Sequence, residues 1–480
     1  MPESNSSLSP ALLAQLQAIL GADFVRSDAD SLAQYGRDRT KNWAATPFAV
    51  VLPADAQQVQ AVVRLAYEAN LAIVPSGGRT GLSGGAVASA GELVLSLGRL
   101  RSIGEFDPIE RSVKVGAGVI TAQLQAWATE HDLFYPVDFA SAGSSQIGGN
   151  IATNAGGIKV IRWGMTRNWV RGLKLVTGTG ELLDLNQGLL KNNAGYDLRH
   201  LMIGSEGTLG VIVEATMGLI APPRQLTALL LAAPSMDAVM QLLHTFQNQL
   251  ELTAFEFFSE AALGKVLARS GLSRPLEAQG DFYALLEFDN TSEAVEAAAL
   301  QAFEQCLEAG WALDGTMSQS EEQRVKLWRL REEISETIAP SSPYKNDIAV
   351  RVAQIPAFLH EIDALVAQNY PDFEIIWFGH IGDGNLHLNI LKPEALSQAD
   401  FYQRCHGVSR QVFEVVQRYG GTISAEHGVG LLKKDYLPYS RSQAEIALMQ
   451  AIKRSFDPKG ILNPGKIFDA LPAEPALGQG

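Results

Sequence analysis

Cysteine is scarce in this sequence. Only Cys306 and Cys405 occur among its 480 residues, and they are far apart along the chain. No disulfide framework and no CxxC zinc pattern can be built from two such residues. We therefore expect reduced thiols and a cytoplasmic protein.

Long apolar runs and an excess of basic residues are also missing. No stretch approaches the roughly 20 apolar residues that span a bilayer. The Ser-rich start of the chain lacks the basic and apolar regions of a secretory signal. We expect no transmembrane span, with peripheral membrane contact left open. Lys and Arg number 38 against 52 Asp and Glu, a net charge of −14. This charge argues against a nucleic-acid partner, and an acidic small substrate would need local cations.

The remaining composition is that of a globular protein, with 46% hydrophobic and 19% charged residues. The length favours two or three domains. The pair Pro222-Pro223 interrupts regular structure, so we expect domains over 1–222 and 223–480. The first is glycine-rich; in the second, strands and helices alternate, and helices follow at about 397–420 and 442–455.

Two glycine-rich runs dominate the first half. Pro75 to Gly85 holds five glycines in eleven residues, and Gly143 to Gly157 forms the second run. Successive backbone N–H groups in such loops form anion-binding nests, which suits a pyrophosphate. A plain tight turn is the alternative for one loop, but two runs are harder to explain as turns. The stretch Val115 to Thr121 resembles a Rossmann fingerprint without its third glycine, and we interpret it as a strand-helix corner.

These runs, with Asn193-Ala-Gly-Tyr-Asp197 and Gly204-Ser-Glu-Gly-Thr-Leu-Gly210, resemble the FAD-binding domain of the vanillyl-alcohol oxidase/p-cresol methylhydroxylase (PCMH) superfamily. The resemblance extends from about residue 35 to 468. It implies an α+β fold with a two-subdomain PCMH-type FAD-binding domain. An α+β capping domain follows, with an antiparallel sheet and C-terminal helices, and its end returns to the flavin.

The resemblance also implies which residues contact FAD. The first run wraps the pyrophosphate, the second lines the flavin, and the remaining contacts come from later segments. The set is Ser76, Gly77, Gly78, Arg79, Thr80, Gly81, Ile147, Gly148, Gly149, Asn150, Thr153, Asn154, Gly157, Glu206, Ile212 and Asn463. Members with a covalent flavin often carry His where Arg79 stands. Arginine is a poor covalent acceptor, so we expect non-covalent FAD.

Two histidines flank a hairpin signal in the second half. Asp383-Gly384 is a favoured two-residue turn, and pairing outward from it places His380 directly opposite His387. Directly opposed residues have Cβ atoms about 5 Å apart, close enough for two imidazoles to share a metal ion. Asn389 lies two residues beyond His387 and therefore points to the same face.

A third ligand must come from elsewhere, and the stretch from Ser424 offers Glu426 and His427. Two His and one carboxylate leave coordination positions open, as a catalytic metal site requires. Surface histidines and an unrelated Glu-His pair are the alternative. Both motifs resemble the FAD-linked oxidase C-terminal family, most closely the branch that oxidises D-2-hydroxyglutarate. The resemblance implies that His380, His387 and Glu426 bind zinc and that His427 is the base, although the donors also suit iron or manganese.

Local cations occur at Arg331 and Lys345. Arginine can bind a carboxylate through two hydrogen bonds, and lysine adds a point charge. A solvated helix face is the alternative for Arg331, which lies among glutamates. The resemblance implies that Arg331, Ser335 and Lys345 hold the substrate's distal carboxylate, with Asn389 and His427 also in the substrate site. Ser335 stands where the family has Thr, so selectivity for a diacid is less secure.

The expected activity is FAD- and metal-dependent oxidation of a D-2-hydroxy acid, with D-2-hydroxyglutarate as the first candidate. The metal would acidify the substrate hydroxyl, His427 would take its proton, and hydride would pass to the flavin. The alternatives are a D-lactate or glycolate dehydrogenase and a non-catalytic FAD-binding subunit of an electron-transfer complex. The expected electron acceptor is an electron-transfer flavoprotein, a quinone or a cytochrome, and a homodimer is compatible with the sequence.

Overall fold

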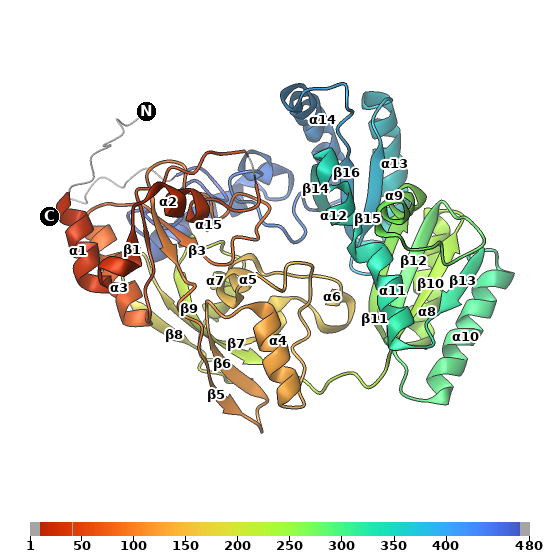
Figure 1. The fold of residues 1–480 in the computed structure, drawn as a ribbon, viewed down its shortest axis with the longest axis horizontal. Coiled ribbons are helices and arrows are strands. Elements are labelled where there is room, and N and C mark those ends of the chain that lie inside the picture. The colour runs from red at the N-terminus through yellow and green to blue at the C-terminus, as the bar shows by residue number, and fades with distance from the viewer. Residues whose placement is uncertain (1–9, 41, 471–480) are drawn as a thin grey trace. The chain divides into compact units, whose positions relative to one another are not determined.

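The computed structural model describes residues 10–40 and 42–470, so the Ser-rich start of the chain lies largely outside it. The chain forms two compact units (Figure 1). The first contains the chain up to residue 155, residues 165–222 and the chain from residue 426; the second contains residues 156–164 and 223–425. The chain therefore enters the second unit twice. No helix in the described ranges has the length and apolar character needed to cross a membrane.

A four-stranded sheet opens the first unit, with strand order β1-β2-β4-β3 and parallel pairing among the last three. Its strands are β1 (Val25–Arg26), β2 (Ala49–Val51), β3 (Ile73–Ser76) and β4 (Leu93–Ser96). The helices of this part are α1 (Pro10–Leu20), α2 (Ala29–Tyr35) and α3 (Ala56–Glu68). Asp55 caps α3 by accepting from the Gln58 N–H. The buried residues of α3 recur at helical spacing: Val59, Val62, Val63 and Ala66.

An antiparallel sheet with strand order β5-β6-β9-β7-β8 forms the other part of the first unit. Its strands are β5 (Ile103–Asp107), β6 (Ser112–Gly116), β7 (Val170–Val176), β8 (Leu182–Leu185) and β9 (Val211–Gly218). The helices are α4 (Thr121–Glu130), α5 (Ile147–Thr153), α7 (Arg199–Met202) and α15 (Gln443–Phe456). A Cβ on Gly116 or Gly118 would lie 2.2 Å from a backbone carbonyl. These glycines therefore serve close packing, which confirms the predicted strand-helix corner.

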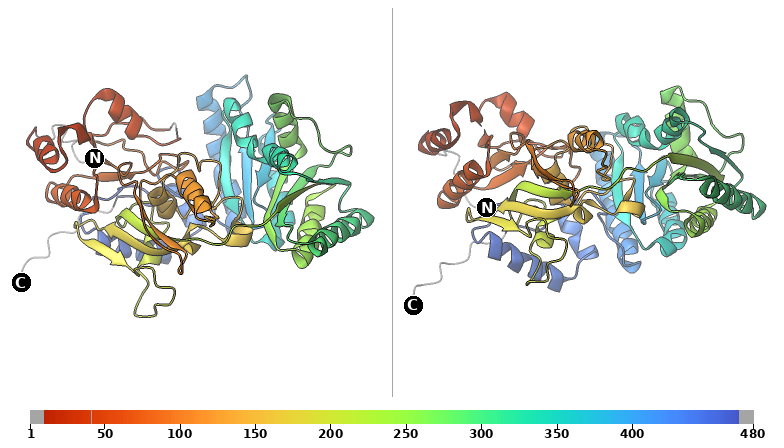
Figure 2. Two further views of the ribbon diagram at one scale, coloured as in Figure 1. Left: turned by 60° about the horizontal axis from the view of Figure 1, so that its bottom comes forward. Right: turned by 90° about the horizontal axis from the view of Figure 1, so that it is seen from below.

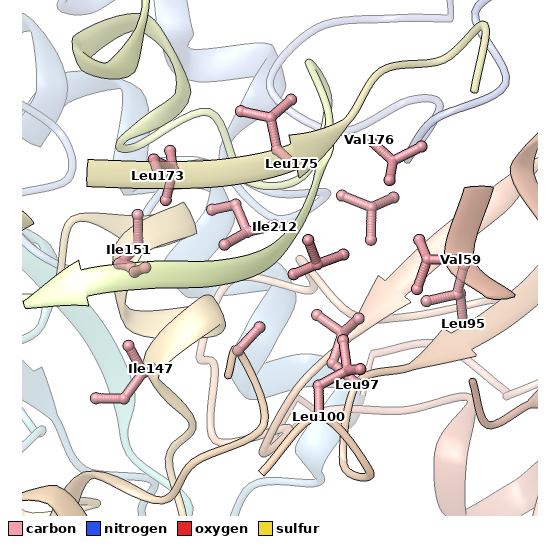
Figure 3. Close-up of a cluster of buried hydrophobic side chains, with 14 of the residues drawn as sticks. Val59, Leu95, Leu97, Leu100, Ile147, Ile151, Leu173, Leu175, Val176 and Ile212 are labelled. Atoms are coloured by element: carbon pink, nitrogen blue, oxygen red, sulfur yellow. The ribbon is translucent and has the colours of Figure 1, made fainter. Parts of the chain in front are cut away.

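One apolar core joins the two parts of the first unit. Ile147 and Ile151 of α5 face Leu173 of β7 and Ile212 of β9, and the same cluster extends to Leu95 of β4 (Figure 3). The buried side of α5 is thus fixed against both sheets. This packing sets the position of the second glycine-rich run.

The second unit is built on a seven-stranded antiparallel sheet with the order β13-β10-β12-β11-β15-β16-β14. Its strands are β10 (Leu226–Ala233), β11 (Leu252–Ser259), β12 (Phe282–Asp289), β13 (Asp314–Met317), β14 (Tyr344–Ala349), β15 (Ile375–Gly379) and β16 (Asn385–Ile390). The α+β class and the antiparallel sheet confirm the fold predicted from the sequence.

Helices lie on both faces of this sheet (Figure 2). One face packs against α9 (Glu260–Ser270), α11 (Glu321–Glu332) and α12 (Ile334–Ile338). The other elements are α8 (Met236–Gln249), α10 (Glu293–Glu308), α13 (Ile355–Asn369) and α14 (Gln398–Arg418). Every predicted metal or substrate residue in this unit belongs to the sheet, to α11, to α12 or to the loop after β15.

A short segment from the N-terminal half belongs to the second unit. It contains α6 (Val160–Trp163), and Lys159 in it is buried in an ion pair with Glu287 of β12. A Cβ on Gly382 would lie 2.7 Å from the side chain of Ile161. Gly157, one of the residues expected at the flavin, lies in this segment with φ of 125°.

Candidate active site

The first glycine-rich run leaves β3 and passes close to the second. A Cβ on Gly78 would lie 2.2 Å from the carbonyl oxygen of Ser144 and 2.9 Å from Cα of Ser145, an approach that only glycine allows. Arg79 has φ of 58°, and its guanidinium carbon lies 4.5 Å from the centre of the Tyr35 ring. Burial lowers the pKa of Arg79, but a guanidinium stays charged at neutral pH. The run therefore combines backbone amides with one fixed cation.

Helix α5 presents one glycine to open space. A Cβ on Gly148 would lie 2.7 Å from Cβ of Ala117, so Gly148 permits helix packing. A Cβ on the next residue, Gly149, would meet nothing within 4 Å, although Gly149 is half-buried. The open space beside Gly149 leaves room for a ligand against this helix.

The polar side chains of the same run turn toward the protein. Asn150 donates Nδ2 to Thr121 Oγ1 over 2.7 Å, and Thr153 donates its hydroxyl to the Gly149 carbonyl over 3.0 Å. Asn154 ends the helix in a left-handed conformation with φ of 50° and accepts from a backbone N–H. These contacts rigidify the run, so its backbone and Gly149 form the surface that remains.

Four buried polar atoms near these runs have no hydrogen-bond partner among the described residues: Asp38 Oδ2, Ser76 Oγ, Gln146 Oε1 and Asn463 Oδ1. Gln146 Oε1 lies 3.5 Å from the Cβ position of Gly77. An unpaired buried polar atom costs about 1–3 kcal/mol. Their accumulation beside the glycine-rich runs fits a large polar cofactor, and FAD has the phosphates and ring edges to occupy such a site.

The C-terminal segment returns to these runs through Asn463. Its backbone N–H donates to the Ile73 carbonyl over 2.7 Å. Its Nδ2 donates to the carbonyls of Gly85 and Glu206 over 2.9 and 2.7 Å. Asn463 thereby joins the end of the chain to the first glycine-rich run.

Glu206 holds the loop that follows His427. Its two carboxylate oxygens accept from the backbone N–H groups of Val429 and Gly430, each over 2.8 Å. Burial raises the pKa of Glu206, although these two hydrogen bonds oppose the shift. A Cβ on Gly428 would lie 2.9 Å from the Glu206 carboxylate carbon. The loop is therefore closely fitted around this side chain.

In the second unit, His380 and His387 lie on one face of the sheet, but in a different register from the predicted one. Strands β15 and β16 pair Phe378 with His387, so the direct pairing of the two histidines was wrong by two residues. Because side chains alternate with a period of two, this shift keeps both histidines on the same face. Their ring centres are 5.4 Å apart.

The register shifts because the turn is wider than two residues. The His380 carbonyl accepts from both the Asp383 and the Asn385 N–H groups. The Gly384 carbonyl accepts from the N–H of Val350, the residue that follows the neighbouring strand β14. That contact holds residues 380–384 in a five-residue loop, which no local sequence signal reveals.

Each histidine has a buried carboxylate beside it. His380 Nδ1 lies 2.8 Å from Glu256 Oε1, on β11. Asp347 of β14 is the direct strand partner of His387, and its Oδ1 lies 3.9 Å from His387 Nδ1. Both carboxylates are 1% exposed. A carboxylate beside the inner ring nitrogen is typical of metal-binding histidines.

The predicted substrate cations lie on the same part of the second unit. Arg331 is only 6% exposed, so its interpretation as a solvated helix face is wrong. Its Nη2 is 2.8 Å from Glu256 Oε2, and its guanidinium carbon is 4.7 Å from the centre of the Phe378 ring. Lys345 is exposed and is the strand partner of Asn389, while Ser335 lies on α12.

Glu426 and His427 follow a segment that is fixed to the second unit. Thr422 pairs with Ala349 at the end of β14, and the Ser424 hydroxyl donates to Asp347 over 3.5 Å. Glu426 comes two residues later and begins the last segment of the first unit. Its Oε1 lies 3.8 Å from His427 Nε2.

Comparison with known proteins gives the family. A model of the C-terminal domain of FAD linked oxidases matches residues 222–467, more than half of the chain, and a model of an FAD binding domain matches residues 47–186. The chain belongs to the FAD-linked oxidase family. This membership confirms the predicted family and FAD, and makes the chain an FAD-dependent oxidoreductase.

Several relatives of this FAD-linked oxidase carry the same name. D-2-hydroxyglutarate dehydrogenase of Stutzerimonas stutzeri (strain A1501) is 60% identical over 461 residues, which cover 96% of this chain and 99% of that protein. The protein of that name from Xanthomonas citri pv. viticola is 54% identical, with 96% and 97% covered. The mitochondrial protein of that name from Arabidopsis thaliana is 33% identical, with 96% and 82% covered.

Solved structures show the fold. A p-cresol methylhydroxylase structure aligns with a TM-score of 0.78 at 16% identity and covers 96% of each chain. An alkyldihydroxyacetonephosphate synthase structure aligns with a TM-score of 0.72 at 18% identity, with 95% of this chain and 86% of that chain covered. The PCMH-type fold predicted from the glycine-rich runs is thereby confirmed.

Sequence reasoning missed the carboxylates that contact these groups. Glu256 interrupts the apolar strand LTAFEFFS, and Asp347 precedes Ile348 in the strand YKNDIA. A charged residue inside an apolar strand signals a buried charge that needs a partner. The signal marks such residues but does not identify what they contact.

Proposed function

We propose that this FAD-linked oxidase oxidises D-2-hydroxyglutarate to 2-oxoglutarate with the help of a divalent metal ion, zinc. Two relatives of that activity share 60% and 54% of their aligned residues with this chain. The observation that carries the proposal is the grouping of His380, His387 and Arg331 on one face of the second unit. A hydroxy acid needs both kinds of group, because its carboxylate requires a cation and its hydroxyl a Lewis acid.

We propose residues 1–222 as the FAD-binding domain and residues 223–480 as the substrate-capping domain, whose C-terminal end returns to the flavin. The FAD contacts are those expected from the sequence, with Gly149 and the backbone of residues 76–81 as the main surfaces. Arg79 is engaged with Tyr35, which is consistent with non-covalent binding. When bound, FAD supplies the hydride acceptor that the side chains lack.

The proposed metal ligands are His380, His387 and Glu426. Imidazole nitrogens with a carboxylate oxygen suit zinc, and also iron or manganese. When bound, the metal supplies Lewis-acid chemistry that acidifies a coordinated hydroxyl. Asn389 points to the same face as His387 and is proposed to contact the substrate.

His427 is proposed as the base that removes the 2-hydroxyl proton, because a neutral imidazole takes up a proton near neutral pH. Arg331, Ser335 and Lys345 are proposed to hold the distal carboxylate. One observation favours a monoacid such as D-lactate or glycolate as second candidate. Glu256 already pairs with Arg331, so less positive charge is left for a second carboxylate.

Turnover also needs an electron acceptor, for which an electron-transfer flavoprotein, a quinone or a cytochrome is proposed. A homodimer is the proposed assembly. Neither the electron acceptor nor the assembly affects the reduction of the flavin by the substrate, which can be measured without a partner.

The testing experiment is an anaerobic titration of the flavin spectrum with D- and L-2-hydroxyglutarate, D-lactate and D-malate. We expect D-2-hydroxyglutarate to bleach the flavin and a chelator to stop the bleaching. Bleaching by D-lactate alone would select the monoacid. A flavin that no hydroxy acid bleaches would replace the proposal with a non-catalytic FAD-binding subunit.

A further inference from the structure

Glu256 is a buried carboxylate that the proposed reaction does not use. It lies on β11 among apolar neighbours and is 1% exposed. Burying a carboxylate costs several kcal/mol unless charged or hydrogen-bonding partners compensate. Its partners therefore indicate why it is there.

One oxygen of Glu256 fixes the orientation of His380. Oε1 lies 2.8 Å from His380 Nδ1. An ionised carboxylate only accepts hydrogen bonds, so Nδ1 must carry the proton, and the lone pair is on Nε2. The contact selects the tautomer whose outer nitrogen binds a metal, and the aligned strands β11 and β15 hold both residues in place.

The other oxygen of Glu256 forms an ion pair with Arg331, although its geometry is not that of a hydrogen bond. Oε2 lies 2.8 Å from Arg331 Nη2, and the guanidinium also lies over the Phe378 ring. Arg331 Nε is buried and has no hydrogen-bond partner among the described residues. Arg331 thus keeps a buried donor unused while one of its terminal nitrogens is fixed, as expected for a side chain positioned to receive an anion.

We propose that Glu256 is a positioning residue that orients a metal ligand, His380, and a substrate cation, Arg331, through one carboxylate. This inference rests on the proposed function. It predicts that one substitution weakens two apparently separate properties, the affinity for metal and the recognition of a distal carboxylate.

Glu287 provides a matched control in the same sheet. It lies on the neighbouring strand β12, on the same sheet face as Glu256, and is 0% exposed. It also pairs with an arginine, Arg324, and it accepts from Trp328 Nε1 over 2.8 Å. Its side-chain partners among the described residues are Lys159, Thr253, Arg324 and Trp328, none of them a proposed site residue, so Glu287→Gln tests the loss of a buried carboxylate alone.

The experiment compares wild type, Glu256→Gln and Glu287→Gln as FAD-loaded proteins. Zinc affinity is measured by competition with a chromophoric chelator, and KM is measured for D-2-hydroxyglutarate and D-lactate with a dye acceptor. For Glu256→Gln we expect a zinc affinity about 10- to 100-fold lower and a KM that rises more for the diacid than for D-lactate. For Glu287→Gln we expect a lower Tm with unchanged zinc affinity.

Glu256→Asp covers the case in which the amide variant does not fold. It keeps the charge but is one methylene shorter, so it cannot reach both partners. We expect a Tm near wild type and weaker zinc binding. Wild-type zinc affinity in a folded Glu256 variant, or an equal loss in Glu287→Gln, overturns the inference alone. A wild-type protein that binds no zinc and is insensitive to chelator overturns the metal part of the proposed function as well.

Discussion

Replacing Gly149 with alanine distinguishes an effect on FAD binding from an effect on the stability of the fold at the second glycine-rich run. The added methyl group would meet no protein atom within 4 Å. Gly149 lies inside α5 and has no positive φ, so its backbone accepts alanine. Any penalty must therefore come from a molecule that occupies the open space.

The substitution should stabilise the FAD-free protein and destabilise the FAD-bound protein. In the FAD-free protein, alanine in place of glycine inside a helix stabilises by about 0.5–1 kcal/mol. In the FAD-bound protein, a methyl group forced into a packed contact costs about 1–3 kcal/mol. The second value corresponds to FAD binding that is roughly 5- to 150-fold weaker.

The assay combines thermal unfolding of FAD-free protein with an FAD titration followed by flavin fluorescence. Gly143→Ala is the matched control, because its Cβ also meets nothing within 4 Å, but Gly143 is exposed. We expect Gly143→Ala to bind FAD like wild type. If Gly149→Ala also keeps the wild-type Kd, the flavin does not lie against this helix, and our interpretation of the open space is refuted.

Three further outcomes are expected. His427→Gln should lower kcat by about 10²–10⁴-fold with an unchanged flavin spectrum; wild-type kcat with a dye acceptor removes His427 from the mechanism. Glu206→Gln replaces a charge-assisted acceptor, worth about 1.5–3 kcal/mol, so amide hydrogen exchange at Val429 and Gly430 should accelerate by roughly 10- to 150-fold; unchanged exchange contradicts the role of Glu206. Burial lowers the pKa of Lys466 to about 8, from an ordinary 10.5. The unfolded state then binds more protons in that window, so FAD-free protein should gain about 3 kcal/mol of stability as pH rises through it. Lys466→Met should remove this gain, and equal urea-unfolding curves across the window would contradict it.

Local patterns in the sequence were sufficient for most of the fold. The helices predicted at about 397–420 and 442–455 form as α14 and α15, and a serine side chain, Ser397 or Ser442, caps the start of each. The glycine-rich runs were located because the chain needs glycine where two backbones meet, as at Gly78 and Ser144. The helices depend on residues close together in sequence, and the close backbone approach depends on glycine, which no other residue can replace there.

The hairpin between β15 and β16 shows where local reasoning fails. Asp383-Gly384 is a strong turn signal, but the Gly384 carbonyl accepts a hydrogen bond from the N–H of Val350, the residue after β14, and the loop is wider than two residues. His380 and His387 still lie on the same face of the sheet, because a register shift of two residues does not change the face to which a side chain points. A slip of one residue would have turned His380 away from His387.

The two buried carboxylates mark the limit of sequence reasoning most clearly. Glu256 contacts a histidine 124 positions away, and Glu206 accepts from a backbone group 223 positions away. No spacing rule connects such pairs, since only the folded chain brings them together. Yet each fixes a group whose proposed chemistry came from a short motif: His380, the proposed metal ligand, and the loop that follows His427, the proposed base. The short motifs indicate which reaction is possible, whereas Glu206 and Glu256, distant in sequence, fix the positions of the groups that the motifs supply.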